Sequence, residues 1–209
     1  LSAEQESPEV LFLQATAESL WAQCSPDPGS SQNVVRSALR KLSDLIAKAP
    51  NFENIAFAYA QAARLHDLLG NADEAAKLCE ECLQKDLEPR ERLDCLFELA
   101  EARHLAGRYS EAEHALAEAL RYAEFDKARL PELYSTLGVI LYASNRPEEA
   151  REAFQKTLTE VEAQPYLPDN PTVLKEVYWN LGQVYYDLGD HEKAIVTLRK
   201  LLPLYPRSE

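Results

Sequence analysis

Four blocks of similar sequence recur along the chain, and they constrain its fold more than any other feature. They read LLGNADEAA, LAGRYSEAE, YASNRPEEA and DLGDHEKAI. Each block contains an alanine on which the four can be aligned, and these alanines, at intervals of 37, 38 and 44 residues, are Ala75, Ala112, Ala150 and Ala194. Self-similarity at an interval of roughly 20 to 50 residues indicates a repeat architecture, in which one structural unit is stacked several times.

Each unit is predicted to be a helical hairpin. Apolar residues recur three and four positions apart on both sides of each block, which is the period of an amphipathic helix and differs from the alternation of a strand. In the last unit, Gly189 can adopt the left-handed conformation that ends a helix, and Asp190 can cap the helix that follows. A chain with only 6 glycines and many Ala, Leu, Glu, Lys and Arg residues fits an all-α fold.

The last unit resembles the tetratricopeptide repeat. The residues that carry the resemblance are Tyr178, Trp179, Asn180, Leu181, Gly182, Tyr185, Asp187, Leu188, Gly189, Asp190, Ala194, Leu198 and Pro206. Weaker copies of the motif are carried by Leu137, Gly138, Ala150 and Phe154, by Leu99, Ala100, Gly107, Tyr109, Ala112 and Ala119, and by Ala62, Ala63, Gly70, Ala75 and Cys82. The resemblance implies a right-handed α-α superhelical solenoid with a concave groove.

We expect a single solenoid domain over residues 1–209, built of about five hairpins. The four units with a legible motif cover residues 53–88, 90–124, 128–163 and 172–206, and a divergent first repeat covers 8–50. In that first repeat we predict helices from Phe12 to Ala22 and from Val34 to Ala47, with a loop over 26–31. Three prolines between Ala163 and Thr172 exclude a continuous helix there.

The charge of the chain excludes several classes of partner. The formal net charge is −13, so a phosphate backbone or an anionic lipid surface would be repelled. No stretch approaches the roughly 18 apolar residues that a membrane span needs. We therefore predict a soluble, cytoplasmic protein that binds neither nucleic acid nor membrane. The chain starts at Leu1 and contains no Met, which suggests a trimmed or processed piece.

Cys79 and Cys82 have the spacing of a redox or zinc pair, and Cys95 lies close by in sequence. Both residues of the pair fall on the inward stripe of a predicted second helix, where free cysteine packs as a small apolar residue. No second pair at matching spacing accompanies them, the four histidines stand singly, and no glycine-rich phosphate loop is present. We predict core cysteines and no metal, cofactor or catalytic residue. An enzyme or redox protein built on Cys79 and Cys82 is the less favoured alternative.

The resemblance also implies which side chains line the groove, because the first helix of each hairpin forms the concave face in this family. Carried over by register, the predicted groove residues are Phe57, Arg64, Phe97, Glu101, Tyr142, Trp179, Gln183, Tyr186 and Asp187. Exposed aromatic side chains on rigid helices are typical of interface hot spots. We predict as anchors Phe97, Tyr142, Trp179 and Tyr186.

Two functions follow from this arrangement. The first is a protein-protein interaction module that binds a partner peptide or helix with basic and apolar side chains in the acidic-aromatic groove. The second is an assembly scaffold that self-associates through the ends of the solenoid. No polar capping helix follows the last apolar stripe, so Ile195, Leu198 and Leu202 are expected to be partly uncovered. A homodimer contact through the C-terminal helix, or further chain, would account for that exposure.

Overall fold

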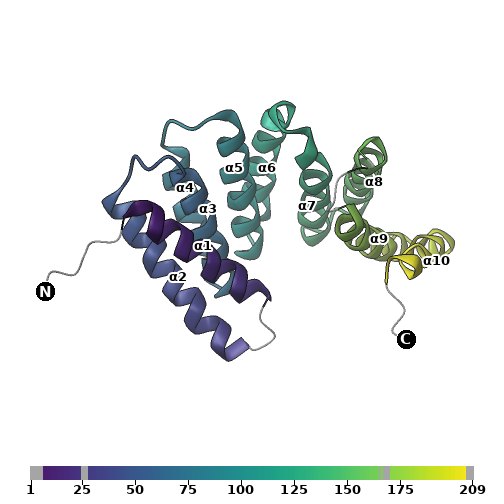
Figure 1. Cartoon of the computed structure of the whole chain (residues 1–209). Helices are drawn as coiled ribbons and strands as arrows, with labels where there is room; N and C mark the ends of the chain where they lie inside the picture. The colour runs from purple at the N-terminus through teal and green to yellow at the C-terminus, as the bar shows by residue number, and fades with distance from the viewer. Residues whose placement is uncertain (1–6, 25–27, 165, 167–169, 206–209) are drawn as a thin grey trace, which may run out of the picture. The chain divides into compact units, whose positions relative to one another are not determined.

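The structure is a computed structural model that describes residues 7–24, 28–164, 166 and 170–205. Within these ranges the chain forms ten α-helices and three short 3-10 helices, and it contains no strand (Figure 1). The predicted all-α class is therefore confirmed. The chain divides into two compact units, Leu1–Gly107 and Arg108–Glu209, and the boundary falls inside the predicted repeat 90–124.

Unit 1 contains five α-helices within its described residues. They are α1 (Pro8–Cys24), α2 (Pro28–Lys48), α3 (Ile55–Leu68), α4 (Ala72–Leu83) and α5 (Pro89–Leu105). Each helix packs on the next along the chain, as Figure 1 shows for α1 and α2. In addition, α3 contacts both α1 and α5. Alternate helices are thus neighbours, which is the arrangement expected of stacked helical hairpins.

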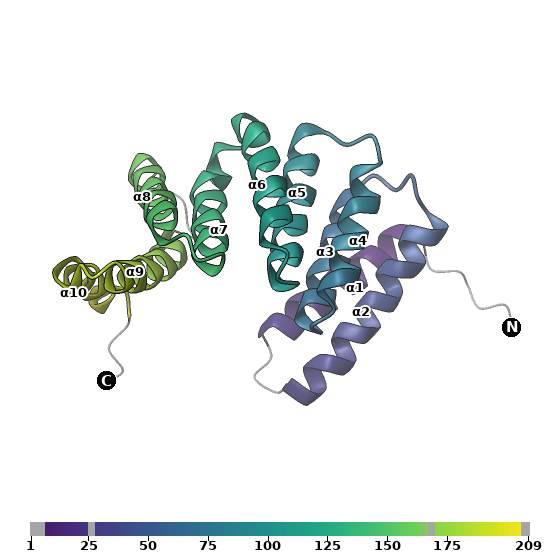
Figure 2. The same cartoon turned by 180° about the vertical axis from the view of Figure 1, so that it is seen from behind.

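Unit 2 repeats this arrangement. Its elements are α6 (Tyr109–Tyr122), η1 (Ala123–Phe125), η2 (Lys127–Arg129), α7 (Leu130–Ala143), α8 (Pro147–Ala163), α9 (Asn170–Asp187), α10 (His191–Arg199) and η3 (Leu202–Leu204). Consecutive α-helices pack on one another, as Figure 2 shows for α9 and α10, and α7 also contacts α9. Two of these hairpins, α7–α8 and α9–α10, lie where the sequence predicts the last two units.

Close helix packing in unit 2 depends on two glycines of the repeat motif, Gly138 and Gly182. A Cβ atom added to Gly138 of α7 would lie 2.5 Å from Cε1 of Phe154 on α8. A Cβ atom added to Gly182 of α9 would lie 2.5 Å from Cδ2 of Leu198 on α10. Both distances are far below van der Waals contact, so a larger residue would force the helices apart. The small residue on one helix and the large one on the next form a matched pair.

The turn of the last hairpin has the predicted geometry. Gly189 has φ +77, a left-handed conformation that costs glycine little. Asp190 caps α10, because its Oδ1 accepts a hydrogen bond from the backbone N–H of Lys193 at 3.2 Å. The corresponding turn between α7 and α8 uses Asn145, with φ 61, instead of glycine.

The first two helices are both longer than predicted: α1 spans Pro8–Cys24 rather than Phe12–Ala22, and α2 spans Pro28–Lys48 rather than Val34–Ala47. The loop predicted over 26–31 is wrong for residues 28–31, because α2 begins at Pro28; residues 26 and 27 lie outside the described residues. Proline is favoured at the first helical position, where no intrahelical N–H is required. Helix α9 begins at Asn170, two residues before the predicted start of the last unit. The last helix ends at Arg199, and a 3-10 turn follows.

Candidate partner-binding site

In unit 2, helices α7, α9 and α10 form a pocket of about 360 Å³, here called the α9 pocket. Its lining residues are Tyr142, Trp179, Gly182, Gln183, Tyr186, Asp187, His191, Ala194, Ile195 and Leu198. Five of the nine predicted groove residues are among them, namely Tyr142, Trp179, Gln183, Tyr186 and Asp187. A volume of this size can hold one or two side chains of a partner.

The floor of the α9 pocket is apolar and comes mostly from α10. Ala194, Ile195 and Leu198 form it together with Gly182 of α9. The predicted groove residues did not include these α10 side chains, because only the first helix of each hairpin was expected to line the groove. The signal was nevertheless present in the sequence: a glycine at 182 brings α10 close enough for its side chains to reach the groove.

Two aromatic side chains border the pocket. Trp179 is 54% exposed and Tyr186 is 64% exposed, so the predicted exposure of both is confirmed. The ring of Tyr186 also lies near the ring of His191, with centroids 5.0 Å apart. Large aromatic surfaces that stay accessible on rigid helices offer a partner much contact area at little entropic cost.

One carboxylate lies among the lining residues, which include no lysine and no arginine. The hydroxyl of Tyr142 on α7 donates a hydrogen bond to Oδ2 of Asp187 on α9 at 2.5 Å. This bond, followed by burial, raises the pKa of Tyr142. Because α7 and α9 belong to different hairpins, the bond holds the Asp187 side chain in place across the groove.

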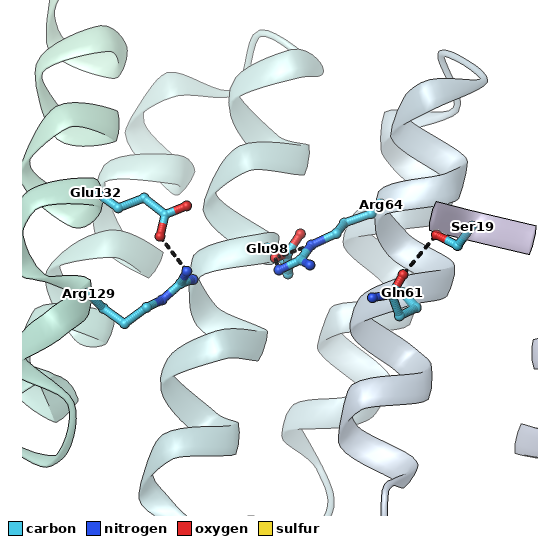
Figure 3. A network of polar contacts seen from close by, with 6 residues as sticks. All are labelled: Ser19, Gln61, Arg64, Glu98, Arg129 and Glu132. Atoms are coloured by element: carbon cyan, nitrogen blue, oxygen red, sulfur yellow. Dashed lines mark hydrogen bonds and ion pairs between the residues drawn. The ribbon is translucent and has the colours of Figure 1, made fainter. Parts of the chain in front are cut away.

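Further acidic groups lie on the same two helices. Partial burial, and then the charge of Glu132 on α7, raise the pKa of Glu176 on α9. Glu132 itself forms an ion pair with Arg129 (Figure 3). Glu176 and Glu132 thus lie close enough to affect one another, and Arg129 balances the charge of Glu132.

The predicted groove residues of unit 1 have a different environment. Arg64 of α3 forms an ion pair with Glu98 of α5, which is fully buried, and its Nε donates to Oε1 of Glu98 at 2.7 Å (Figure 3). Burial lowers the pKa of Arg64, but Glu98, Glu101 and Asp94 outweigh it and the net shift is upward. One guanidinium thus faces three carboxylates. A second buried bond joins α1 to α3, with Ser19 Oγ donating to Gln61 Oε1 at 3.0 Å.

Phe97 corrects one prediction. It was expected to be an exposed anchor, but it is only 2% exposed. Helix α5 is buried almost all round, since Leu93, Cys95 to Ala100 and Ala102 are all buried. On such a helix the apolar period does not distinguish groove from core. Phe57 is 44% exposed and packs edge-on against Phe12, with centroids 5.6 Å apart, whereas Glu101 is half-buried.

Asp67 is a further carboxylate of unit 1 with an altered environment. Burial and the charge of Glu98 raise its pKa to about 7. Its Oδ1 is buried and accepts no hydrogen bond from the described residues. Asp67 follows Arg64 by three residues on α3, so it lies one helical turn away on the same side.

Three cysteines of unit 1 lie in the core, and for Cys79 and Cys82 this confirms the prediction. Cys79, Cys82 and Cys95 are at most 1% exposed. Sγ of Cys82 and Sγ of Cys95 are 2.6 Å apart and join α4 to α5. Burial raises the pKa of Cys79, and the contact with Cys82, followed by burial, raises that of Cys95. Thiols with raised pKa values are poor nucleophiles, so these groups act as packing residues.

Metal sites and membrane-spanning helices are two other features that a chain of this kind could carry. No group of three or more His, Cys, Asp or Glu side chains in the described ranges is placed to hold a metal ion. None of the described helices is long and apolar enough to cross a bilayer.

The chain matches the family model for the tetratricopeptide repeat over residues 129–207. Residues 129–207 are tetratricopeptide repeats. This region comprises the two hairpins of the α9 pocket, where the motif is clearest, and the resemblance predicted from the motif is confirmed there. No curated protein matches the sequence.

Solved tetratricopeptide-repeat structures share the fold over nearly the whole chain. BtubC (BKLC) from P. vanneervenii is 19% identical with a TM-score of 0.71, and the match covers 98% of this chain and 96% of that one. A Podosopora anserina protein with nearly identical TPR-like repeats is also 19% identical with a TM-score of 0.71, and the match covers 96% and 97%. For MamA from Desulfovibrio magneticus RS-1 the identity is 19%, the TM-score 0.60 and the coverage 91% and 94%. At these identities the likeness concerns the fold alone, and it confirms the predicted solenoid class.

Proposed function

We propose that this chain is a non-enzymatic binding module and that the α9 pocket takes a partner segment with one basic side chain next to apolar ones. The fold supports protein binding in general, since tetratricopeptide repeats present a groove of rigid helices. The chemistry of the α9 pocket limits which class of partner segment can bind there. The observation that carries the proposal is one held carboxylate, Asp187, between exposed aromatic rings and an apolar floor.

The apolar floor and the aromatic rim favour a long, amphipathic side chain. A lysine or arginine can lay its aliphatic stem along Ile195 and Leu198 while its charged head stays at the rim. There the head meets the ring faces of Trp179 and Tyr186, which attract cations. Asp187 can accept a hydrogen bond from the same head, and a charge-assisted bond is among the stronger polar contacts.

Charge selects against other partners. An acidic peptide would bring carboxylates toward Asp187 and Glu176 on a chain of net charge −13, which costs free energy and slows encounter. A purely apolar peptide would bury the floor but leave the Asp187 carboxylate partly desolvated with no cation to compensate its charge, which is also costly. The mixed basic and apolar segment is the one that uses every feature of the pocket.

A display selection tests the proposal. Random twelve-residue peptides would be selected on the intact chain, and the same library on Trp179→Ala/Tyr186→Ala. The proposal predicts that selected peptides are enriched in Lys or Arg next to Leu, Ile or Phe, and that the double variant loses this enrichment. Phe125→Ala, which removes an exposed ring of unit 2 outside the pocket, is the matched control and should select the same peptides as the intact chain. Enrichment of acidic peptides, or retention of the same peptides by the double variant, contradicts the proposal.

A further inference from the structure

Helix α1 is apolar on two opposite faces. Its inner face, which packs on α2 and α3, includes the buried residues Ala15, Ser19 and Ala22. Its outer face carries an apolar stripe, called the α1 stripe, made of Val10, Leu13, Leu20 and Trp21, which are 42%, 65%, 57% and 49% exposed. At 100° per residue these four positions fall within one narrow sector, opposite the buried one. A helix that is apolar on both sides is typical of a helix covered on both sides.

The last hairpin also presents an exposed apolar surface. The α10 surface consists of Ile195 and Val196 on α10, with Leu202 and Tyr205 just after it, and these residues are 53%, 57%, 73% and 56% exposed. Only Ile195 also lines the α9 pocket, so the α10 surface is largely separate from that site.

The charges around the two surfaces differ in sign. Helix α1 carries Glu9 and Glu18 and no basic residue, and Glu18 pairs with Lys41 of α2. Next to the α10 surface lie Arg199 and Lys200, which outnumber the one carboxylate of that helix, Glu192. Two α1 stripes placed together would join helices whose charged residues are all acidic, and two α10 surfaces would join surfaces whose charged residues are mainly basic. Contact between unlike surfaces avoids both repulsions and pairs acid with base.

We propose that copies of this chain associate head to tail, with the α1 stripe of one copy against the α10 surface of the next. The contact buries exposed leucine, valine and aromatic side chains on both sides, and it brings Glu9 near Arg199. Because the two surfaces differ, each copy keeps one of them available after a dimer forms. Such a heterologous contact adds further copies unless the rotation between them closes a ring. The association does not depend on the occupant of the α9 pocket.

Two double variants test the association by sedimentation velocity over a concentration series. Leu13→Lys/Leu20→Lys blocks the α1 stripe, and Val196→Lys/Leu202→Lys blocks the α10 surface without touching the α9 pocket. We expect the average mass of the intact chain to rise past that of a dimer with concentration, and each variant alone to stay monomeric. An equimolar mixture of the two variants should form a one-to-one dimer and nothing larger, because one usable pair of unlike surfaces remains.

A third double variant serves as the control for the association. Leu68→Lys/Leu105→Lys changes two other exposed leucines of unit 1 and should assemble as the intact chain does. Circular dichroism melts establish that each variant is folded. If the α1 stripe variant does not fold, Leu20→Gln replaces it, and if the α10 surface variant does not fold, Leu202→Gln replaces it. A monomeric intact chain at all concentrations overturns the proposal. So does a dimer formed by either blocked variant alone, because that requires contact between like surfaces.

Discussion

The hydroxyl of Tyr142 on α7 donates a hydrogen bond to Oδ2 of Asp187 on α9, at 2.5 Å and on the solvent side of unit 2. We expect Tyr142→Phe to weaken the binding of a selected basic peptide by roughly five- to tenfold, because Asp187 loses the contact that orients it. The free energy of unfolding should fall by no more than about 1 kcal/mol, since the bond is exposed. Fluorescence anisotropy and urea unfolding measure the two effects. Unchanged affinity with a large loss of stability would mean that the bond serves the fold alone.

Asp67 predicts a pH dependence of stability in unit 1. Its folded-state pKa of about 7 lies above the ordinary aspartate value of 3.8. The stabilising contribution of this carboxyl is therefore complete below the lower value and is lost as pH rises through the higher one. Asp67→Asn cannot ionise. The melting temperature of this variant minus that of the intact chain should therefore increase as pH rises between the two pKa values, and it should stay constant at higher pH. Asp86→Asn, at an exposed position, is the control; a pH-independent difference for Asp67→Asn contradicts the assignment.

The buried carboxylate of Glu98 predicts strong coupling to Arg64. Removal of one partner of a buried ion pair leaves the other charge uncompensated, at a cost of about 3 kcal/mol. Because the Arg64 side chain is 39% exposed, the loss of unfolding free energy in Arg64→Gln should be smaller than that value. The double variant Arg64→Gln/Glu98→Gln should be more stable than Arg64→Gln, as measured by urea unfolding. Additive losses would show that the pair is not a unit.

The close contact of Gly138 with Phe154 predicts non-additive stability changes. Gly138→Ala places a methyl group against a fully buried ring, and overpacking of this kind costs about 1 to 3 kcal/mol, partly offset by the better helix propensity of alanine. Phe154→Leu removes the ring and leaves a cavity. Together, the two changes should cost less than their sum, because the smaller side chain makes room for the methyl group. Additive costs in a thermal-unfolding cycle would contradict the packing described for α7 and α8.

The sequence predicted the features that depend on local chemistry. Gly189 ends α9 in a left-handed conformation and Asp190 caps α10, as the sequence of the last unit indicated. Trp179 and Tyr186 are exposed as expected, because α9 is polar enough on one side for its period to distinguish groove from core.

The remaining features depend on packing that no local pattern encodes. Phe97 lies on a helix that is apolar on nearly all sides, so its burial could not be read from the period of α5. Arg64 and Glu98 are 34 residues apart, and their ion pair exists only because α3 packs on α5.

The central claim, that the α9 pocket is the binding surface, can be tested with the two tryptophans of the chain, Trp21 and Trp179. Each indole N–H gives one signal in a ¹⁵N–¹H NMR spectrum, and Trp21→Phe assigns them. During titration with a selected basic peptide, at a concentration where the chain is monomeric, the Trp179 signal should shift and saturate while the Trp21 signal stays in place. A Trp179 signal that does not move while the peptide binds would contradict the claim.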